Sequence, residues 1–198
     1  MLSQIRPALV FLALMTVLTG LAYPLTITGI ASVLFPHQAG GSLIEKDGKV
    51  IGSALIGQNF TDSKYFLGRP SATTDTDPND ASKTVPAPYN AANSGGSNAG
   101  PTSKALIERV KADVGTVKQD SIGAVPVDLV TTSGSGLDPD ITPAAAEFQV
   151  RRVAAARSLP VERVRDLVAQ ATEGRFFGVL GEPRINVLKL NMALDAVK

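Results

Sequence analysis

The longest stretch without a charged side chain restricts what the first part of this chain can become. No Asp, Glu, Lys or Arg occurs between Pro7 and Ile44. Its apolar part, residues 8–35, exceeds the roughly 20 residues that an α-helix needs to cross about 30 Å of hydrocarbon. The sequence therefore predicts a transmembrane helix over residues 8–35, between a short segment of residues 1–7 and a domain of residues 36–198.

The charges on either side of this predicted span indicate its orientation. Arg6 and the amino terminus precede it, whereas the first four charges after it nearly cancel, namely Glu45, Lys46, Asp47 and Lys49. Cytoplasmic flanks of membrane helices carry the excess of Lys and Arg. We therefore expect residues 1–7 to be cytoplasmic and residues 36–198 to lie on the outer side.

A cleaved signal peptide is the alternative interpretation of the same segment. Gly20-Leu21-Ala22 loosely resembles a small-residue cleavage site behind a positively charged start. The apolar run continues beyond it to Phe35, whereas the hydrophobic part of a signal peptide covers about 7–15 residues. The length of the run favours a retained anchor.

A proline inside the span points to a partner in the lipid bilayer. Pro24 lacks a backbone N–H and is expected to kink the helix, a defect that a neighbouring membrane helix can repair. Tyr23 is an aromatic residue of the kind found at membrane interfaces. We therefore expect the span to contact another membrane protein at the kink.

Composition excludes several kinds of chemistry. Charged residues make up 19% of the chain and its net charge is +1, so no broad positive field is present to attract nucleic acid. The chain has no cysteine, which removes disulfides, thiolate nucleophiles and zinc–thiolate sites. The single histidine, His37, follows the apolar segment and is interpreted as an interfacial residue.

The part after the span begins with a predicted hairpin and a long loop. Residues 43–60 place the turn signal Asp47-Gly48 between apolar pairs, which predicts two or three short strands. Residues 61–101 are rich in Gly, Ser, Pro and Asp and are expected to be mostly loop. The aromatic side chains that could anchor this loop are Phe60, Tyr65, Phe66 and Tyr89.

The remaining chain alternates helical and extended patterns. Thr142 followed by Pro143 is typical of a helix start, and the alanine-rich run after it has high helix propensity. We predict helices over residues 101–115, 143–157 and 161–171, strands over 125–130 and 185–188, and a short terminal element over 190–197. The fold class is therefore α+β, with one N-terminal transmembrane helix followed by a small mixed α/β extracytoplasmic domain.

Three segments imitate functional motifs and are interpreted as structural. Ser94–Pro101 precedes a helix, where backbone N–H groups can bind an anion, but it lacks the ending of a phosphate loop. Asp75–Asp80 begins like a calcium loop, but its sixth position is Asp80 where glycine is needed. Ser133-Gly134-Ser135-Gly136 does not match a nucleophile elbow. The arginines of the two predicted helices after Pro143 are interpreted as mostly solvated and partly neutralised by Glu147, Glu162 and Asp166.

Seven short motifs occur in a fixed order along the chain. They are Y-P-L from Tyr23, G-S-A-L-I-G-Q-N-F ending at Phe60, F-x-G-R-P-S-A from Phe66, S-G-G-S-N from Ser94, S-G-S-G-L-D ending at Asp138, I-T-P from Ile141, and N-V-L-x-L-N-x-A-L from Asn186. With an anchor in front of them, these motifs resemble the C subunit of Kdp-type potassium-transporting ATPases. The resemblance covers almost the whole length.

The resemblance implies an accessory subunit that is not itself an enzyme. Such proteins act as catalytic chaperones that raise the ATP affinity of a P-type ATPase subunit. The implied partners are that ATPase, a channel-like potassium-translocating subunit and a small single-span subunit. The implied location is the cell inner membrane, with the outer domain in the periplasm near the potassium entrance.

The resemblance also suggests individual residues. A glutamine near the nucleotide corresponds to Gln149, although the expected topology places Gln149 across the bilayer from cytoplasmic ATP. No cofactor is expected to bind stably, no metal site is expected, and ATP contact would be shared with the ATPase subunit. Candidates for contact with partners are Tyr23, Pro24, Gln58, Asn59, Phe60, Arg69, Pro70, Ser71, Gly95, Gly96, Asn98 and Asp138. The alternative functions are an anchored outer-face binding protein unrelated to potassium and a tethered hydrolase.

Overall fold

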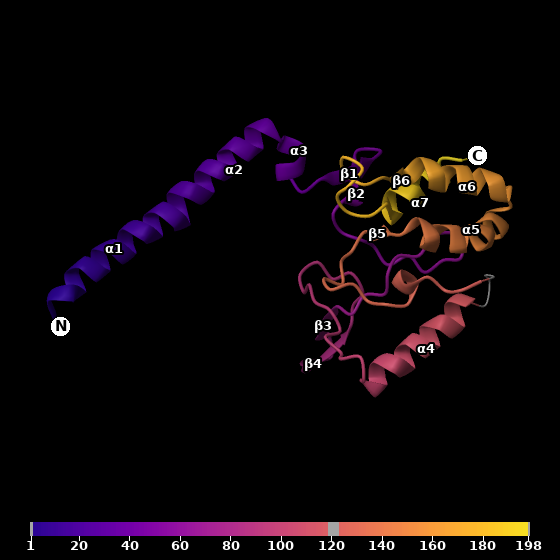
Figure 1. Cartoon of the computed structure of the whole chain (residues 1–198), viewed down its shortest axis with the longest axis horizontal. Coiled ribbons are helices and arrows are strands. Elements are labelled where there is room, and N and C mark those ends of the chain that lie inside the picture. The colour runs from indigo at the N-terminus through magenta and orange to yellow at the C-terminus, as the bar shows by residue number, and fades with distance from the viewer. Residues whose placement is uncertain (1, 119–122, 198) are drawn as a thin grey trace. The chain divides into compact units, whose positions relative to one another are not determined.

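A computed structural model describes residues 2–118 and 123–197 of the chain. The chain divides into two compact units, Met1–Ile51 and Gly52–Lys198, which we call the N-terminal and C-terminal units. Figure 1 labels their helices and strands. The mixture of helices and strands, with one long apolar helix at the start, confirms the predicted fold class.

The N-terminal unit is built on one helix that runs from Ile5 to Leu34. It consists of α1 (Ile5–Val17), a π-helical turn (Leu18–Ala22) and α2 (Tyr23–Leu34), and none of its residues is buried within the protein. At 1.5 Å per residue, 30 residues span about 45 Å, which exceeds the hydrocarbon thickness of a bilayer. In the described part of the chain it is the one helix that is long and apolar enough to cross a membrane.

Pro24 explains the π-helical turn in the middle of this helix. Proline has no N–H to donate to the carbonyl four residues earlier, and its ring crowds that carbonyl. The N–H of Tyr23 instead donates to the carbonyl of Leu18, five residues back. The distortion expected at Pro24 therefore takes the form of one widened turn.

A short helix and a hairpin follow the long helix. α3 (Pro36–Ala39) contains His37, whose carbonyl accepts the N–H of Ser42 at 2.9 Å. Strands β1 (Leu43–Lys46) and β2 (Lys49–Ser53) form a two-stranded sheet. Asp47 and Gly48 both have positive φ, at 53° and 72°, as the tight turn of a hairpin requires. The hairpin prediction is confirmed.

Three helices and a small sheet form the centre of the C-terminal unit. Strand β7 (Arg184–Asn186) pairs in antiparallel fashion with β5 (Asp140–Ile141) on one side and β6 (Thr172–Glu173) on the other. Helix α5 (Pro143–Arg157) packs on α6 (Val161–Ala171), and α6 packs on α7 (Val187–Asp195).

Capping residues explain where two of these helices begin. The Thr142 hydroxyl accepts the N–H of Ala145 at 3.1 Å, and Pro143 occupies the first helical position. The Asn186 side chain accepts the N–H of Lys189 at 3.0 Å and starts α7. The strand predicted over residues 185–188 is therefore only partly right, because this cap turns the chain into a helix at Val187.

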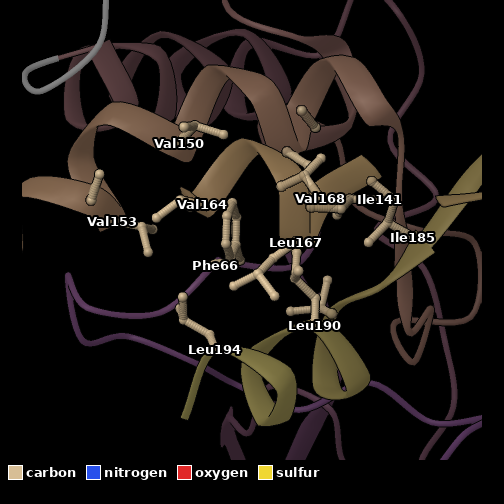
Figure 2. Packing of buried hydrophobic residues seen from close by; sticks show 14 of the residues in the cluster. Phe66, Ile141, Val150, Val153, Val164, Leu167, Val168, Ile185, Leu190 and Leu194 are labelled. Carbon is tan, nitrogen blue, oxygen red and sulfur yellow. The ribbon is translucent and has the colours of Figure 1, made fainter. Parts of the chain in front are cut away.

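The core of the C-terminal unit surrounds one phenylalanine. The ring of Phe66 is fully buried among side chains of α5, α6 and α7, as Figure 2 shows. Its labelled neighbours in that view are Val150, Val153, Val164, Leu167, Leu190 and Leu194. Phe66 comes from the segment that was expected to be loop, so a non-helical stretch supplies the centre of a helical core.

The other elements of the C-terminal unit differ from the predictions in three places. Strands β3 (Thr74–Asp77) and β4 (Asp80–Pro86) form an antiparallel hairpin inside the predicted loop. Helix α4 (Lys104–Lys118) continues past Gly115, where it was expected to end. The strand predicted over residues 125–130 is wrong: a 3-10 turn, Val127–Leu129, occupies it, and Pro126, just before the turn, cannot donate to a strand ladder.

Candidate functional site

The main chain from Ser63 to Leu67, which we call the clamped segment, is held by side chains of α5 and α7. Asn191 accepts the N–H of Phe66 at 2.8 Å and donates to its carbonyl at 3.0 Å. Gln149 does the same for Leu67, at 2.8 and 3.2 Å. A side-chain amide carries one donor and one acceptor group, so each can satisfy both main-chain groups of a residue that has no strand partner.

Two arginines of α5 complete the clamp. Arg152 donates to the carbonyls of Ser63 and Tyr65 and, at 2.7 Å, to the side-chain oxygen of Gln149. Arg157 donates to the carbonyl of Lys64 at 2.7 Å and pairs with Asp195 at 2.6 Å. These two arginines therefore have a structural partner and are not simply solvated.

Gln149 is fully engaged by these contacts. Its oxygen accepts from Leu67 and Arg152, and its nitrogen donates to the carbonyls of Leu67 and, at 3.2 Å, Ala145. The side chain is only 3% exposed. In this conformation the residue suggested for the nucleotide serves to fix the clamped segment on α5.

Arg165 of α6 illustrates the other arginine environment. It donates to Glu147 of α5 at 2.8 Å and to Glu162 at 2.6 Å. These hydrogen bonds with the two carboxylates, Glu147 first, raise the pKa of the guanidinium. The predicted neutralisation of the arginine cluster by glutamates is confirmed at this position.

A cavity of about 420 Å³ lies beside the clamped segment. Helix α4 contributes Arg109, Asp113, Thr116 and Val117 to one wall. The cavity brings together six of the residues suggested as partner contacts, namely Gln58, Asn59, Phe60, Arg69, Pro70 and Ser71. Residues from two separate motifs thus form one concave surface.

Arg69 and Tyr89, which both line this cavity, are held by contacts within the chain. Arg69 pairs with Asp138 at 2.9 Å and donates to the carbonyl of Thr132 at 3.3 Å. The Tyr89 hydroxyl donates to the carbonyl of Arg69 at 2.6 Å. Burial, and then the negative charge of Asp138, raise the pKa of Tyr89 to about 12, so the phenol keeps its proton and remains a donor.

Gly57 and Gly68 allow Tyr89 to lie against the chain. A β-carbon at Gly57 would meet the Tyr89 ring and would lie 2.6 Å from the carbonyl oxygen of Asp138. A β-carbon at Gly68 would meet the Tyr89 hydroxyl. The glycines in two of the seven motifs are therefore needed for close packing around one tyrosine.

The motif that begins at Ser94 contacts the motif that ends at Asp138. The N–H of Gly95 donates to the carbonyl of Ser135 at 2.8 Å, and a β-carbon at Gly96 would lie 3.0 Å from the carbonyl oxygen of Gly134. Ser71 donates to the carbonyl of Gly136 at 2.7 Å. Ser94–Asn98 therefore packs as a structural turn on Ser133–Gly136.

The other candidate residues are not among those that line the cavity. Asn98 is exposed and has a positive φ of 48°. Asp75, Asp77 and Asp80 accept N–H groups of their own hairpin, and Asp80 also pairs with Lys83 at 2.7 Å. No group of three or more His, Cys, Asp or Glu side chains suited to a metal ion occurs among the residues that the structure describes. Tyr23 and Pro24 belong to the N-terminal unit.

Two buried asparagines, Asn191 and Asn186, were not predicted from the sequence. Asn191 is 2% exposed and interrupts the apolar pattern of α7, and a buried amide in an apolar helix face must find partners. Asn186 caps α7 and also donates to the carbonyl of Ala54 at 3.0 Å. Both were visible in the sequence as polar residues within the last motif.

Comparison with known proteins gives matches that extend along the whole chain. Residues 5–196 match the family model described as "K+-transporting ATPase, c chain". The sequence is 69% identical to the potassium-transporting ATPase KdpC subunit of Bradyrhizobium diazoefficiens and 67% identical to that of Methylobacterium nodulans, each over 98% of both chains. It is 68% identical to the same subunit of a Rhodopseudomonas palustris strain over the full length of both. The chain therefore belongs to the KdpC family of potassium-transporting ATPase subunits.

Proposed function

We propose that this chain is a non-catalytic accessory subunit that stabilises the ATP-driven potassium uptake complex and raises the ATP affinity of its P-type ATPase subunit. One observation carries this proposal: the polar side chains of the site bind other parts of the same chain. Gln149 and Asn191 bind main chain, and Arg69 is paired with Asp138. Such a site is suited to presenting a rigid surface to another protein.

We further propose where this surface lies and what it meets. Arg6 before the long helix and the cancelling charges after it favour a cytoplasmic N-terminus and a periplasmic C-terminal unit in the inner membrane. The proposed partners are the channel-like potassium-translocating subunit, the P-type ATPase subunit and the small single-span subunit. The C-terminal unit would lie near the potassium entrance.

The effect on ATP affinity is proposed to be indirect. All the hydrogen-bonding groups of the Gln149 side chain are engaged within the chain, and the proposed topology separates it from cytoplasmic ATP. The chain would thus bind no nucleotide stably by itself and would act on the ATPase through contacts between subunits. A conformation of the ATPase that binds ATP better is favoured if this subunit binds that conformation better.

The test combines recovery of the complex with ATPase kinetics. We would purify the complex through a tag after Lys198 and measure KM for ATP with the subunit present and after its removal. The proposal expects the ATPase and the multi-span subunit to co-purify, and KM for ATP to rise when this chain is absent. Recovery of this chain alone in mild detergent, or an unchanged KM, would contradict it.

A further inference from the structure

The segment between β6 and β7 exposes the most concentrated apolar surface of the C-terminal unit. Phe176, Phe177, Val179 and Leu180, which we call the apolar tip, are 66%, 83%, 72% and 61% exposed. The other strongly exposed large apolar side chains described in this unit, Leu55, Ile107 and Val127, lie far apart in the sequence. Four such side chains within five residues mark an interaction surface rather than chance exposure.

The apolar tip is a preformed structure. Phe176 and Leu180 exchange hydrogen bonds at 2.9 and 3.0 Å, and Gly178 donates to the carbonyl of Arg175 at 3.0 Å. The rings of Phe176 and Phe177 lie against each other with their centres 4.2 Å apart. The chain therefore holds these exposed side chains in one arrangement before any partner binds.

Phe177 adopts a backbone conformation that a phenylalanine rarely adopts. Its φ is 52°, next to Gly178 at 76°, in the left-handed region that favours glycine. A large side chain is thus kept where glycine would be easier to accommodate. Backbone strain of this kind clusters at functional positions such as ligand-binding sites.

The base of the hairpin carries charges that cancel. Arg175 pairs with Glu182 at 2.8 Å, and Arg184 pairs with Glu173 at 3.2 Å and with Asp140 at 3.3 Å. Lys189 lies 3.8 Å from Glu173. These three basic and three acidic side chains at the base of the hairpin carry no net charge together, so this polar rim offers no attraction to an anionic lipid surface.

We infer that the apolar tip is an anchor that inserts into an apolar pocket, lined by aliphatic or aromatic side chains, on another subunit of the complex. This inference rests on the proposed function. Aromatic anchors surrounded by a polar rim are typical of the energetic centre of protein interfaces. A rigid backbone lowers the entropic cost of docking into a shaped pocket, whereas a fluid bilayer does not require a fixed arrangement of side chains.

The size of the tip shows what share of an interface it can form. A buried aromatic side chain contributes about 150–250 Å², so two phenylalanines contribute a few hundred Å². Stable interfaces bury about 1,200–2,000 Å² in total. The tip is therefore one anchor within a larger contact, and its loss should weaken association without preventing folding of this chain.

Photocrosslinking in the intact complex tests the inference. A photoreactive benzoylphenylalanine would replace Phe177 in the full chain, and irradiation would be followed by mass spectrometry of the adducts. We expect an adduct with an identified subunit of the potassium-transporting ATPase, attached at an apolar surface. The same probe at Val127, which is 70% exposed and outside the hairpin, serves as the control and should give a much smaller yield of that adduct.

The other outcomes of this experiment each overturn the inference. An adduct with lipid would show that the tip enters the bilayer, and an adduct with a second copy of this chain would show self-association. Irradiation of an assembled complex without a protein adduct at position 177 would show that the tip is free. Failure of the wild-type chain to recover any other subunit would instead contradict the proposed function.

Two substitutions supply a quantitative check. Phe177→Ser should weaken association of the purified chain with the remaining subunits about tenfold, because the aromatic anchor is lost. Phe177→Leu keeps an apolar side chain and should retain most of the affinity. Equal affinity of wild type and Phe177→Ser would overturn the inference.

Discussion

Two side-chain amides of this domain replace the strand partner that the clamped segment lacks. Buried main-chain N–H and carbonyl groups need hydrogen-bond partners, and the clamped segment runs through the core outside any sheet. Gln149 and Asn191 reach it from two different helices. The position of the Phe66 ring in the core therefore depends on polar contacts as well as on apolar packing.

Replacement of Gln149 tests this dependence. Gln149→Leu keeps a side chain of similar size but leaves the N–H and carbonyl of Leu67 without their partner, which should destabilise the domain by about 2–3 kcal/mol. Urea unfolding of the full chain in detergent, followed by tyrosine fluorescence, measures this loss. Gln170→Leu on the exposed face of α6 is the matched control, and a similar small effect of both substitutions would refute the clamp.

A second prediction concerns the glycine beneath Tyr89. Gly57→Ala would place a methyl group 2.6 Å from the carbonyl oxygen of Asp138, and main chain cannot move away as easily as a side chain can. Overpacking of this kind typically costs about 1–3 kcal/mol. We expect a lower melting temperature for Gly57→Ala, whereas Gly134→Ala, where no neighbouring atom lies within 4 Å, should change it little. Equal melting temperatures would show that the chain around Tyr89 adapts.

On the scale of elements, the short strand β5 carries a carboxyl group that is costly to ionise. Asp140 lies between Arg184 and the carboxylates of Asp138 and Glu173. Burial is the main reason that its pKa is raised above the ordinary value of 3.8, and Arg184 offsets only part of this. The charged form is therefore less favourable in the folded chain than in the unfolded one.

The sign of this shift gives a pH-dependent prediction. A carboxyl whose pKa is raised on folding contributes most to stability below pH 3.8, and this contribution is lost as the pH rises through the folded-state pKa. Asp140→Asn has no carboxyl group at this position and therefore does not lose this stability as the pH rises. The stability of the variant minus that of wild type should therefore increase as the pH rises above 3.8, as urea unfolding across this pH range would show.

An exposed aspartate provides the comparison of opposite sign. The N–H of Lys64, followed by the Lys64 side chain, lowers the pKa of Asp62. Ionised Asp62 therefore contributes to folding stability above pH 3.8, and this contribution is lost as the pH falls. The stability of Asp62→Asn minus that of wild type should therefore decrease with rising pH. Parallel curves for the two variants would show that a general charge effect, and not the burial of Asp140, is responsible.

Local signals identified the helices of this fold better than its strands. Thr142-Pro143 and the alanine-rich run after it predicted α5 within its observed bounds, because a cap and high propensity act over a few residues. β5 and β6 have two residues each, too few to show an alternating pattern, and they exist because β7 pairs with both. Tertiary contacts decide such strands, so no local pattern could have predicted them.

On the scale of the whole molecule, the proposed topology depends on the long helix and the charges beside it. If Arg6 sets the orientation as proposed, protease added to intact spheroplasts should digest the C-terminal unit. Immunoblots with antibodies to this unit and to a cytoplasmic protein measure the result. Protection of the unit until the cells are lysed would reverse the proposed topology.

The same preparation separates an anchor from a cleaved signal peptide. A retained helix leaves the mass of the mature chain close to 20.6 kDa, whereas cleavage after Ala22 would shorten the chain by the first 22 residues. Intact-mass spectrometry of the membrane fraction distinguishes the two products. The retained mass is the expected result.

The motifs suggested candidate residues for the site but not how these residues are arranged. Gln58–Phe60 and Arg69–Ser71 were suggested separately, and the structure brings them to one cavity with α4. The contact between Arg69 and Asp138 joins residues 69 positions apart, and such a pairing has no local signal. The hairpin with the apolar tip was not predicted, because its closing bridge joins only Phe176 and Leu180 and is too short to give an alternating pattern.

The clamp also determines when this protein can fold during its synthesis. Phe66 and Asn191, which bind each other, lie 125 positions apart, so the nascent chain must be made as far as α7 before the core can close. The apolar helix is synthesised long before that point, so it is available for the bilayer before the core around Phe66 can close. Under the proposed topology, delivery to the membrane precedes closure of the core, and a chain arrested before Asn191 would remain tethered to the membrane without a folded C-terminal unit.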